Sequence, residues 1–430
     1  MASIDIHVEH LTRVEGHGDI TFNARDGRVE NVQWSITEAP RFFEAFVRGR
    51  SYDYLQPITS RICGICSIGH SMASLKATEA ALGVETGEQT VLLRRLALHA
   101  ENMQSHILHL GYLVAPDLFG VGSVFPLVHT NKEEVVKIVA LHRLANYMSD
   151  LTCGRTTHPI RLKVGGFSMI PTKKELLELK GRLEGSIQTI MDVANVVRSA
   201  AGALPDFSRE TEYIGLVSDD HYALYDGEIG STDTGIHPVK DYLDITNEYV
   251  VPQSTAKYAK HNRDSYMVGA LARFNLNYEK LSPLGKEVAS LFGLKPISYN
   301  PFMNNIAQLV EYADSVQDSL FIIDELLDRG LKEDNAEVVV KAGRGIGAVE
   351  VPRGILFHDY TIDKTGNCVK ANCIIPTNQN HANIQHDMEA LGPTLLDRSE
   401  KEIELALEML VRAYDPCISC STHYLNVRFK

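Results

Sequence analysis

Two C-x-x-C pairs at opposite ends of the chain constrain its fold more than any other feature. Cys63 and Cys66 form the first pair, and Cys417 and Cys420 form the second. Roughly 350 residues separate the pairs, whereas the pairs of a zinc ribbon lie ~15 to 20 residues apart, so a local zinc knuckle is a poor explanation. Four thiolates brought together are soft donors that suit zinc, an iron–sulfur cluster or a nickel–iron centre rather than magnesium or calcium. Spacing does not choose among these metals, but it predicts that the two ends of the chain meet.

The balance of charge excludes several classes of partner. The 430 residues contain 42 Lys and Arg against 55 Asp and Glu, which gives a net charge of −13 with histidine neutral. That sign repels phosphate backbones and anionic lipid surfaces, so we expect no nucleic-acid partner. The most apolar stretch, 110–128, is interrupted by two prolines and an aspartate, and the first residues do not resemble an export signal. Seven cysteines are too few for a secreted disulfide framework. We therefore expect a cytoplasmic protein without a membrane span.

The hydrophobic pattern predicts one mainly helical α+β body over residues 1–430, with a large helical bundle and small peripheral antiparallel sheets. An N-terminal β-hairpin region is expected at about 1–38, because Asp26-Gly27 is typical of a two-residue hairpin turn. The helical core is expected at about 41–204 and 280–330, a peripheral excursion at about 210–258, and strands followed by helices at 336–430. The longest helices are predicted at 67–82, 88–114, 132–151, 173–200 and 301–327, and the late strands at 338–351, 355–363 and 368–375.

Two features of the sequence imitate binding motifs. The stretch 343–347 (GRGIG) is similar to a glycine-rich dinucleotide loop, but the sequence that follows is not helical, so we expect no NAD site on this chain. Cys153, Cys368 and Cys373 form no ferredoxin-like run, and we interpret them as packed thiols.

The residues around the paired cysteines are more specific than the spacing of the pairs. Arg61–His70 (RICGICSIGH) and Asp415–His423 (DPCISCSTH) resemble the two signature motifs of the large, catalytic subunit of [NiFe] hydrogenases. The resemblance spans essentially the whole chain in family order and continues in 13–17 (RVEGH), 40–44 (PRFFE), 154–159 (GRTTHP), 351–354 (VPRG) and 375–377 (IPT). It implies the hydrogenase large-subunit fold, and the chain looks most like the soluble, cofactor-coupled group with its NAD(P)-linked and sulfhydrogenase types.

The resemblance implies that the four cysteines hold a nickel–iron centre. Cys63 and Cys417 would be terminal ligands of nickel, while Cys66 and Cys420 would bridge nickel to an iron that carries carbon monoxide and cyanide. Sulfur is polarisable enough to bridge two metals, and a thiolate also accepts a proton. The implied reaction is the reversible heterolysis of H2 into protons and electrons.

Two charged residues would act beside this centre. Glu15 would take a proton from the sulfur of Cys417, although a glutamate in a glycine-flanked loop is ordinarily a solvated turn residue. Arg353 would overhang the metals, where its permanent positive charge polarises H2 and hydrogen-bonds cyanide. Without the resemblance, an isolated arginine is more often part of a surface ion pair.

Four further residues are assigned by the same resemblance or by position. Thr377 is expected to be a second cyanide partner, and Asp415 is placed near the metals because it is close to Cys417 in the chain. Asp117 resembles by position a family aspartate that pairs with the arginine over the active site. His70 is expected to hydrogen-bond a cysteine sulfur rather than to bind metal directly.

A second metal ion is also implied. Glu44 and His423 match family residues that hold it together with a backbone carbonyl near Cys373. Carboxylate, carbonyl and water favour magnesium, and imidazole also suits iron, so either ion fits. In the family a maturation protease usually cuts after the histidine that matches His423, yet seven residues, 424–430, follow it here.

The expected partners follow from the use of the cysteines. No cysteine set is left for an iron–sulfur relay, so an iron–sulfur small subunit is expected on the face that holds the two pairs, with further flavin and iron–sulfur subunits of the diaphorase type. The acceptor is expected to be NAD(P) or ferredoxin, with coenzyme F420 and heterodisulfide reductase left open. Two alternatives remain at this point: a quinone-site subunit related to respiratory complex I, whose relatives lack the full cysteine quartet, and a noncatalytic scaffold stapled by zinc.

Overall fold

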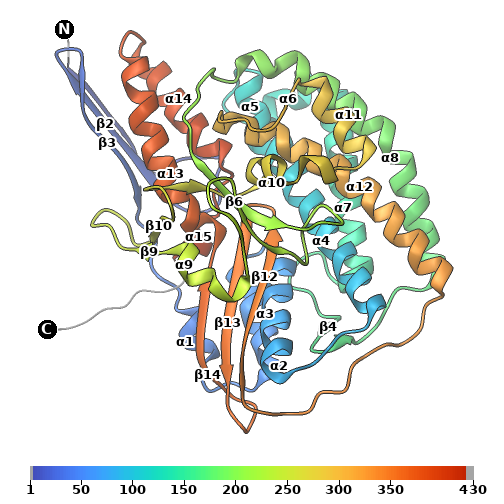
Figure 1. Cartoon of the computed structure of the whole chain (residues 1–430). Coiled ribbons are helices and arrows are strands. Elements are labelled where there is room, and N and C mark those ends of the chain that lie inside the picture. Colours follow the sequence, from blue (N-terminus) through green and yellow to red (C-terminus); the bar gives the residue numbers. More distant parts are fainter. Residues whose placement is uncertain (1–2, 423–430) are drawn as a thin grey trace, which may run out of the picture.

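The N-terminal segment forms the predicted antiparallel sheet. The computed structural model describes residues 3–422, and its first sheet has the order β1 (Ile4–Val8), β2 (Gly18–Arg25) and β3 (Arg28–Ile36). Asp26 and Gly27 join β2 to β3 with φ angles of 48° and 73°, as a type I′ turn requires, so the predicted hairpin is confirmed. The hairpin extends from the body on the side opposite the long helices (Figure 1).

Long helices form the bundle that makes up most of the chain. α12 (Asn304–Arg329) packs against α4 (Glu88–Leu108), α8 (Lys173–Ala200) and α11 (Pro283–Leu291), and α4 also packs against α7 (Lys132–Cys153). Thr172 and Glu175 make the capping box that begins α8, as predicted. The helix expected at 88–114 is divided, because a π-helical turn at His109–Val114 follows α4.

A second antiparallel sheet, with strand order β12 (Gly343–Val351), β13 (Gly354–Ile362) and β14 (Cys368–Ile374), is covered by α3 (Ser67–Leu82) (Figure 1). The glycines of the GRGIG stretch explain how closely the two layers approach. A Cβ atom at Gly343, Gly345 or Gly347 would lie 2.1–2.2 Å from backbone oxygens of α3. These glycines therefore serve helix-to-sheet packing, and β12 begins five residues later than predicted.

The segment 210–258, predicted as a peripheral excursion, has both exposed turns and a buried part that packs into the interior. β6 (Glu212–Val217) is almost wholly buried in a four-stranded sheet of order β11 (Tyr266–Met267), β6, β7 (Glu228–Ser231) and β8 (Gly235–His237). Tyr213, Tyr222, Leu224 and Tyr225 belong to the main hydrophobic cluster. The Gly- and Asp-rich composition concealed this burial, since short strands joined by turns leave little periodicity to detect.

The remaining elements are short or lie close to the cysteine pairs. They are α1 (Phe43–Val47), α2 (Tyr52–Thr59), α5 (Ala115–Leu118), α6 (Val124–Thr130), β4 (Leu162–Lys163), β5 (Gly166–Phe167), α9 (Tyr242–Thr246), β9 (Glu248–Tyr249), β10 (Tyr258–Ala259), α10 (Ala270–Asn277), α13 (Pro376–Leu391), α14 (Glu400–Ala413) and α15 (Ile418–Ser421). The mainly helical α+β fold is confirmed. Within the described residues, no helix has both the length and the apolar character needed to cross a bilayer.

Candidate metal centre

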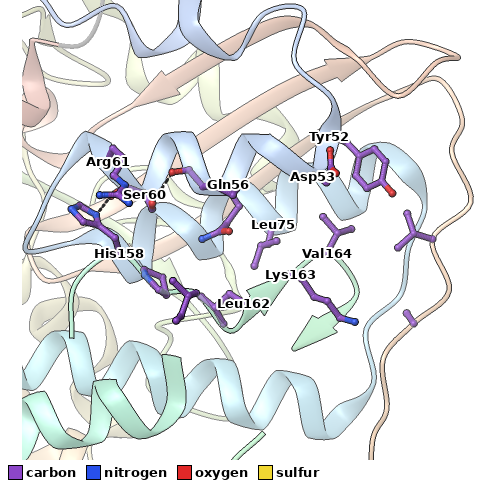
Figure 2. A pocket seen from close by; sticks show the side chains of 15 residues that line it. Tyr52, Asp53, Gln56, Ser60, Arg61, Leu75, His158, Leu162, Lys163 and Val164 are labelled. Carbon is purple, nitrogen blue, oxygen red and sulfur yellow. Dashed lines mark hydrogen bonds between the residues drawn. The ribbon is translucent and has the colours of Figure 1, made fainter. Parts of the chain in front are cut away.

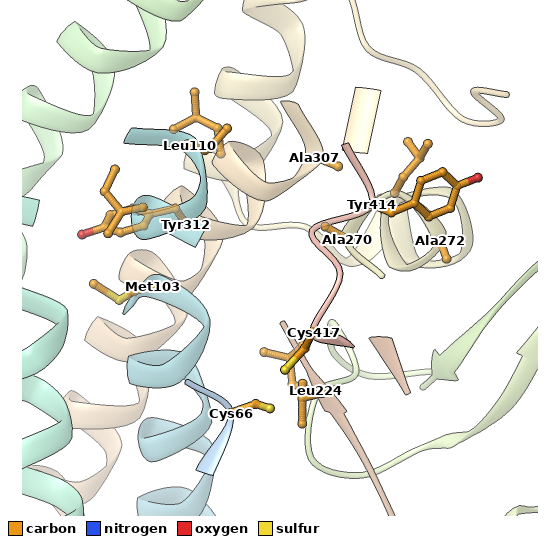
Figure 3. Close-up of a cluster of buried hydrophobic side chains, with 14 of the residues drawn as sticks. Cys66, Met103, Leu110, Leu224, Ala270, Ala272, Ala307, Tyr312, Tyr414 and Cys417 are labelled. Atoms are coloured by element: carbon orange, nitrogen blue, oxygen red, sulfur yellow. The ribbon is translucent and has the colours of Figure 1, made fainter. Parts of the chain in front are cut away.

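The structure brings the two cysteine pairs together in the interior. The sulfurs of Cys63, Cys66, Cys417 and Cys420 all lie within 4.8 Å of one another, and the sulfurs of Cys63 and Cys417 are 3.5 Å apart. All four side chains are buried. Cys66 and Cys417 extend from different parts of the chain toward the same region beside Leu224 (Figure 3). Four sulfurs at this separation form a closed set of soft donors.

The first pair is fixed by the start of α3. The backbone N–H groups of Ile65 and Cys66 donate to the Cys63 sulfur at 3.3 and 3.2 Å. Glu101 on α4 accepts from the N–H groups of Ile68 and Gly69 at 2.6 and 3.0 Å, so this buried side chain holds the first turn of the helix. Burial raises the pKa of Glu101 to about 8. Sequence reasoning missed Glu101, because nothing in the α4 sequence marks it as a partner of a distant helix start.

The second pair is fixed by the N-terminal loop and by α13. Cys417 forms a parallel β-bridge with Glu15, and the Ile418 N–H donates to the Glu15 carbonyl at 2.9 Å. The hydroxyl of Thr377, in the first turn of α13, accepts from the Cys417 N–H at 3.0 Å. The predicted neighbours Glu15 and Thr377 thus lie against the second pair.

Arg41 ties the two pairs to each other, and sequence reasoning missed it. Its Nη2 donates to the carbonyl of Ile62, just before the first pair, at 2.5 Å and to the carbonyl of Ser419, inside the second pair, at 2.6 Å. Its Nε also donates to Ser419 at 3.0 Å. Arg41 lies in the PRFFE motif, but Glu44 was the only residue of that motif predicted to belong to the site. Arginine suits this position because its planar group donates in several directions at once.

Replacing Arg41 with alanine is expected to lower nickel content and to destabilise the fold. The variant loses three charge-assisted hydrogen bonds, each worth about 1.5–3 kcal/mol in a favourable case, and the two cysteine loops lose their common anchor. R41K should fall between wild type and R41A, because a lysine reaches fewer acceptors. Metal analysis and thermal unfolding measure both effects, with the exposed Arg48→Ala as control. Equal nickel content in R41A and R48A would contradict the anchoring role.

The donor set is suited to a positively charged occupant. Burial raises the pKa of Cys417 and raises that of Cys420 to about 11, while hydrogen bonds from Cys417 and then from the other two cysteines lower the pKa of Cys63. Deprotonating several of these neighbouring thiols is therefore unfavourable without a bound cation. Metal cations supply the compensating charge, so these residues fit a metal centre.

Arg353 adds a buried cation beside the sulfurs. Its Nε donates to the Asp415 carbonyl at 2.5 Å and its Nη2 donates to the Asp415 carboxylate at 2.8 Å. Burial alone would lower the pKa of Arg353, but the charges of Asp415, Cys417, Cys66 and Cys63 raise it, so the guanidinium stays protonated. Among the described residues, its buried Nη1 has no hydrogen-bond partner. An unused N–H donor beside thiolates suits anionic ligands of a bound metal.

The predicted pairing of Asp117 with the arginine over the site is wrong. Asp117 accepts from Arg13 at 2.6 Å and from Arg412 at 2.8 and 3.0 Å, while Arg353 is paired with Asp415. The physical reason is that Arg412 on α14 is fully buried and needs a carboxylate, which α5 supplies. Asp117 therefore joins α5 and α14 to the loop that carries Glu15.

The Glu15 side chain is half-buried and held by a residue that sequence reasoning missed. Ser419 lies between the cysteines of the second pair, and its N–H and hydroxyl donate to the two carboxylate oxygens of Glu15 at 3.0 and 2.6 Å. The contact joins positions about 400 residues apart in the chain, so no local pattern indicates it. The carboxylate is oriented toward the loop that contains Cys417.

The residues expected at the second metal ion are only partly described. The Cys373 N–H donates to the buried carboxylate of Glu44 at 2.8 Å, so these two predicted neighbours are adjacent. His423 lies outside the described residues. His70 Nδ1 is 3.2 Å from His358 Nε2, and a contact of His70 with a cysteine sulfur stays a prediction.

Comparisons with known proteins agree with this geometry. The family described as "Nickel-dependent hydrogenase" matches residues 41–149 and 233–423, and one described as "HoxL-like" matches residues 5–39. The chain is 32% identical to the sulfhydrogenase 2 subunit alpha of Pyrococcus furiosus over 98% of this chain and all of that protein. It is 29% identical to the NAD-reducing hydrogenase HoxS subunit beta of Cupriavidus necator, over 97% of this chain and 94% of the relative. It is also similar to a solved NAD+-reducing [NiFe]-hydrogenase in the H2-reduced state, with a TM-score of 0.88, 26% identity and coverage of 98% and 100% of the two chains.

Proposed function

The chain belongs to the nickel-dependent hydrogenase family as a catalytic large subunit, and from this premise we propose that it splits H2 reversibly at a nickel–iron centre held by its four clustered cysteines. The observation that carries the proposal is the buried quartet of sulfurs within 4.8 Å. A zinc staple needs the same sulfurs but neither the unpartnered donor of Arg353 nor the carboxylate of Glu15 beside the second pair.

Each cysteine has a proposed place at the centre. Cys63 and Cys417 would hold nickel, and Cys66 and Cys420 would be shared between nickel and iron. When bound, a nickel–iron centre with carbon monoxide and cyanide on iron supplies the Lewis acidity and the redox chemistry that H2 heterolysis requires. Arg353, through its free Nη1–H, and Thr377, through its hydroxyl proton, would donate to the anionic ligands and orient the centre.

The chain itself supplies the proton acceptor. The Cys417 sulfur would be the first holder of a proton released at the centre, and the Glu15 carboxylate, which Ser419 holds by two hydrogen bonds, would accept that proton from it. Buried apolar side chains such as Leu224 exclude water around the sulfurs, so protons leave only through polar groups. Asp415 keeps Arg353 in place over the site.

A second ion is proposed at the other end of the second cysteine loop. Glu44, the backbone carbonyl of Cys373 and His423 would hold magnesium or iron. The adjacency of Glu44 and Cys373 supports this assignment.

The electrons are proposed to leave through the iron–sulfur clusters of a small subunit. Gly64, between the cysteines of the first pair, is exposed, and Phe42 and Phe46 nearby are 41% and 54% exposed. A cavity of about 500 Å³ has Arg61, Ser60 and His158 at one end and Tyr52 and Asp53 at the other (Figure 2). An exposed apolar and basic face next to a redox site suits a docked electron-transfer partner.

Replacing Arg61 with glutamate is expected to weaken binding of the small subunit about tenfold or more, because the reversed charge faces the proposed interface. Co-purification and titration of the two subunits measure the effect. Lys174→Glu, on the exposed start of α8, is the matched control. If R61E and K174E bind equally well, the partner docks elsewhere.

Further flavin and iron–sulfur subunits are proposed to pass the electrons to NAD(P) or ferredoxin in the cytoplasm. The names of the relatives, which include NAD-reducing hydrogenase and sulfhydrogenase subunits, support a soluble acceptor. F420 and heterodisulfide reductase remain alternatives, because the acceptor is set by other subunits.

The proposed function is tested by analysis of the purified complex. We expect nickel and iron in the large subunit, infrared bands of iron-bound carbon monoxide and cyanide, and H2-dependent reduction of a dye. One equivalent of zinc, no nickel and no infrared bands would overturn the proposal in favour of the zinc-stapled scaffold.

A further inference from the structure

A second buried arginine supports the turn that carries Arg353. β12 ends at Val351, which pairs with Gly354 at the start of β13, so Pro352 and Arg353 are the two residues of a hairpin turn. The whole turn is buried, and buried carbonyls need hydrogen-bond donors. Arg273 on α10 supplies donors to two of them.

Arg273 is fully buried, and each of its five N–H donors has an acceptor. Its Nη1 donates to the Val351 carbonyl at 2.8 Å and its Nη2 donates to the Pro352 carbonyl at 3.0 Å. Its Nε and Nη2 donate to the two carboxylate oxygens of Glu311 at 2.7 and 2.6 Å, and its Nη1 also donates to Glu350 at 2.7 Å. A lysine has three donors on one nitrogen, so it does not reproduce this set of contacts.

The two carboxylates that hold Arg273 are themselves fixed. Glu311 on α12 accepts from the Tyr222 hydroxyl at 2.6 Å, and Glu350 accepts from the Leu216 N–H at 2.7 Å. Leu216 belongs to β6, and Tyr222 follows that strand in the chain. The interior part of this segment therefore fixes the residues that orient Arg273.

The charges of this group keep Arg273 in place. Burial alone would lower the pKa of Arg273, but the charges of Glu311 and Glu350 raise it, so the guanidinium stays protonated. Burial alone would raise the pKa of Glu311, but Arg273 lowers it to about 2. Burial raises the pKa of Glu350 to about 7, so Glu311 is the main counter-charge of Arg273.

Arg353 is thus held at both ends. Asp415 binds its side chain at 2.5 and 2.8 Å, while Arg273 binds the backbone of its turn. The turn also packs closely on the start of α10, because a Cβ atom at Gly354, where φ is 134°, would lie 2.9 Å from the Gly269 nitrogen. A long side chain keeps one direction only when its base and its tip are both fixed.

We propose that Arg273 is a positioning residue, which sets the place of the Arg353 guanidinium over the metal centre by holding the carbonyls of Val351 and Pro352. This inference rests on the proposed function, in which Arg353 donates from Nη1 to anionic ligands of the metals. Within the described part of the chain, no hydrogen-bond partner of Arg273 is a cysteine, so Arg273 acts through Arg353.

Arg273→Lys is the first variant, because it keeps the buried positive charge and loses the fork that grips both carbonyls. H2 oxidation is expected to fall about 10- to 100-fold, since a misplacement of about 1 Å can cost ~10²-fold. Nickel content should stay near that of the wild type, while the infrared bands of cyanide should shift. Arg94→Lys is the matched control: Arg94 is equally buried and pairs with Glu79, but its backbone contact is with Lys163. R94K should lose stability and keep the wild-type infrared bands.

A double variant separates positioning from general support of the fold. Arg353→Lys removes the donor itself and is expected to lower H2 oxidation by ~10²–10³-fold. If Arg273 acts through Arg353, R273K/R353K should match R353K within about threefold, because the effects of coupled sites do not add. Losses that multiply in the double variant would overturn the proposal.

Crystals of the complex give a readout independent of activity. In R273K we expect the Arg353 guanidinium to be displaced and its contact with Asp415 to lengthen, whereas in R94K both should stay as in the wild type. An unmoved Arg353 with unshifted cyanide bands in R273K would overturn the proposal. Missing nickel and infrared bands in the wild type would instead overturn the proposed function, which the position of Arg353 does not test.

Glu350→Gln serves if R273K does not fold, because it leaves the pair of Arg273 with Glu311 intact. The single oxygen of glutamine accepts from either the Leu216 N–H or Arg273, so one donor loses its acceptor. We expect a smaller displacement of Arg353 and a smaller shift of the cyanide bands. Wild-type bands and an unmoved Arg353 in E350Q would contradict the support of the turn by Arg273.

Discussion

Replacing Cys66 with serine is expected to abolish both retention of the nickel–iron centre and H2 oxidation. Cys66 is proposed to bridge the two metals, and a serine oxygen is a harder and less polarisable donor than a thiolate. Even the loss of an outer-shell partner costs ~10–100-fold in affinity or activity, so loss of a bridging ligand should exceed about 100-fold. Nickel and iron content, the infrared bands and dye reduction under H2 measure the result.

Cys153→Ser is the matched control for this variant. Cys153 is equally buried but lies outside the quartet, and burial raises its pKa to about 12, so its thiol is neutral and packs as an apolar group. C153S should keep its metals and its activity while losing some stability. If C66S retained a full complement of nickel, the quartet would not be the metal site.

Local signals predicted the parts of the fold that local forces determine. The Asp26-Gly27 turn, the Thr172 capping box and the bounds of α3 and α8 follow from neighbouring residues, and the structure confirms them. The role of the glycines in Gly343–Gly347 could not be predicted in this way. They allow close contact with the backbone of α3, which is more than 250 residues away in the chain. The burial of β6 likewise depends on partners that no short window contains.

The residues of the candidate site likewise fall into those that a local pattern predicts and those that only distant contacts explain. The cysteines were found because their spacing and flanking residues form a pattern along the chain. Arg41 and Glu101 were missed because they bind backbone groups of distant loops. Nearly every residue has the same backbone carbonyl and N–H, so the sequence does not indicate which of them a side chain will bind. Asp117 was paired wrongly because its position identified a carboxylate, but the buried Arg412 decided which arginine it meets.

Replacing Glu15 with glutamine is expected to stop proton transfer from Cys417 while the metals stay bound. Glutamine keeps the shape of the side chain, and its oxygen still accepts from the Ser419 N–H, but its amide does not take up a proton near neutral pH. H2 oxidation should fall by ~10²–10⁴-fold, as expected for loss of a proton-transfer group. Nickel content and infrared bands should match the wild type, because Glu15 is not a proposed ligand.

HD formation from D2 reports whether the first proton leaves the centre. In E15Q it should fall together with H2 oxidation, since the first proton no longer leaves the Cys417 sulfur. Glu15→Asp keeps a carboxylate with a shorter reach and should recover part of both activities. An E15Q enzyme with wild-type HD formation would show that the first proton leaves by another group, and Glu15 would then be a structural partner of Ser419 alone.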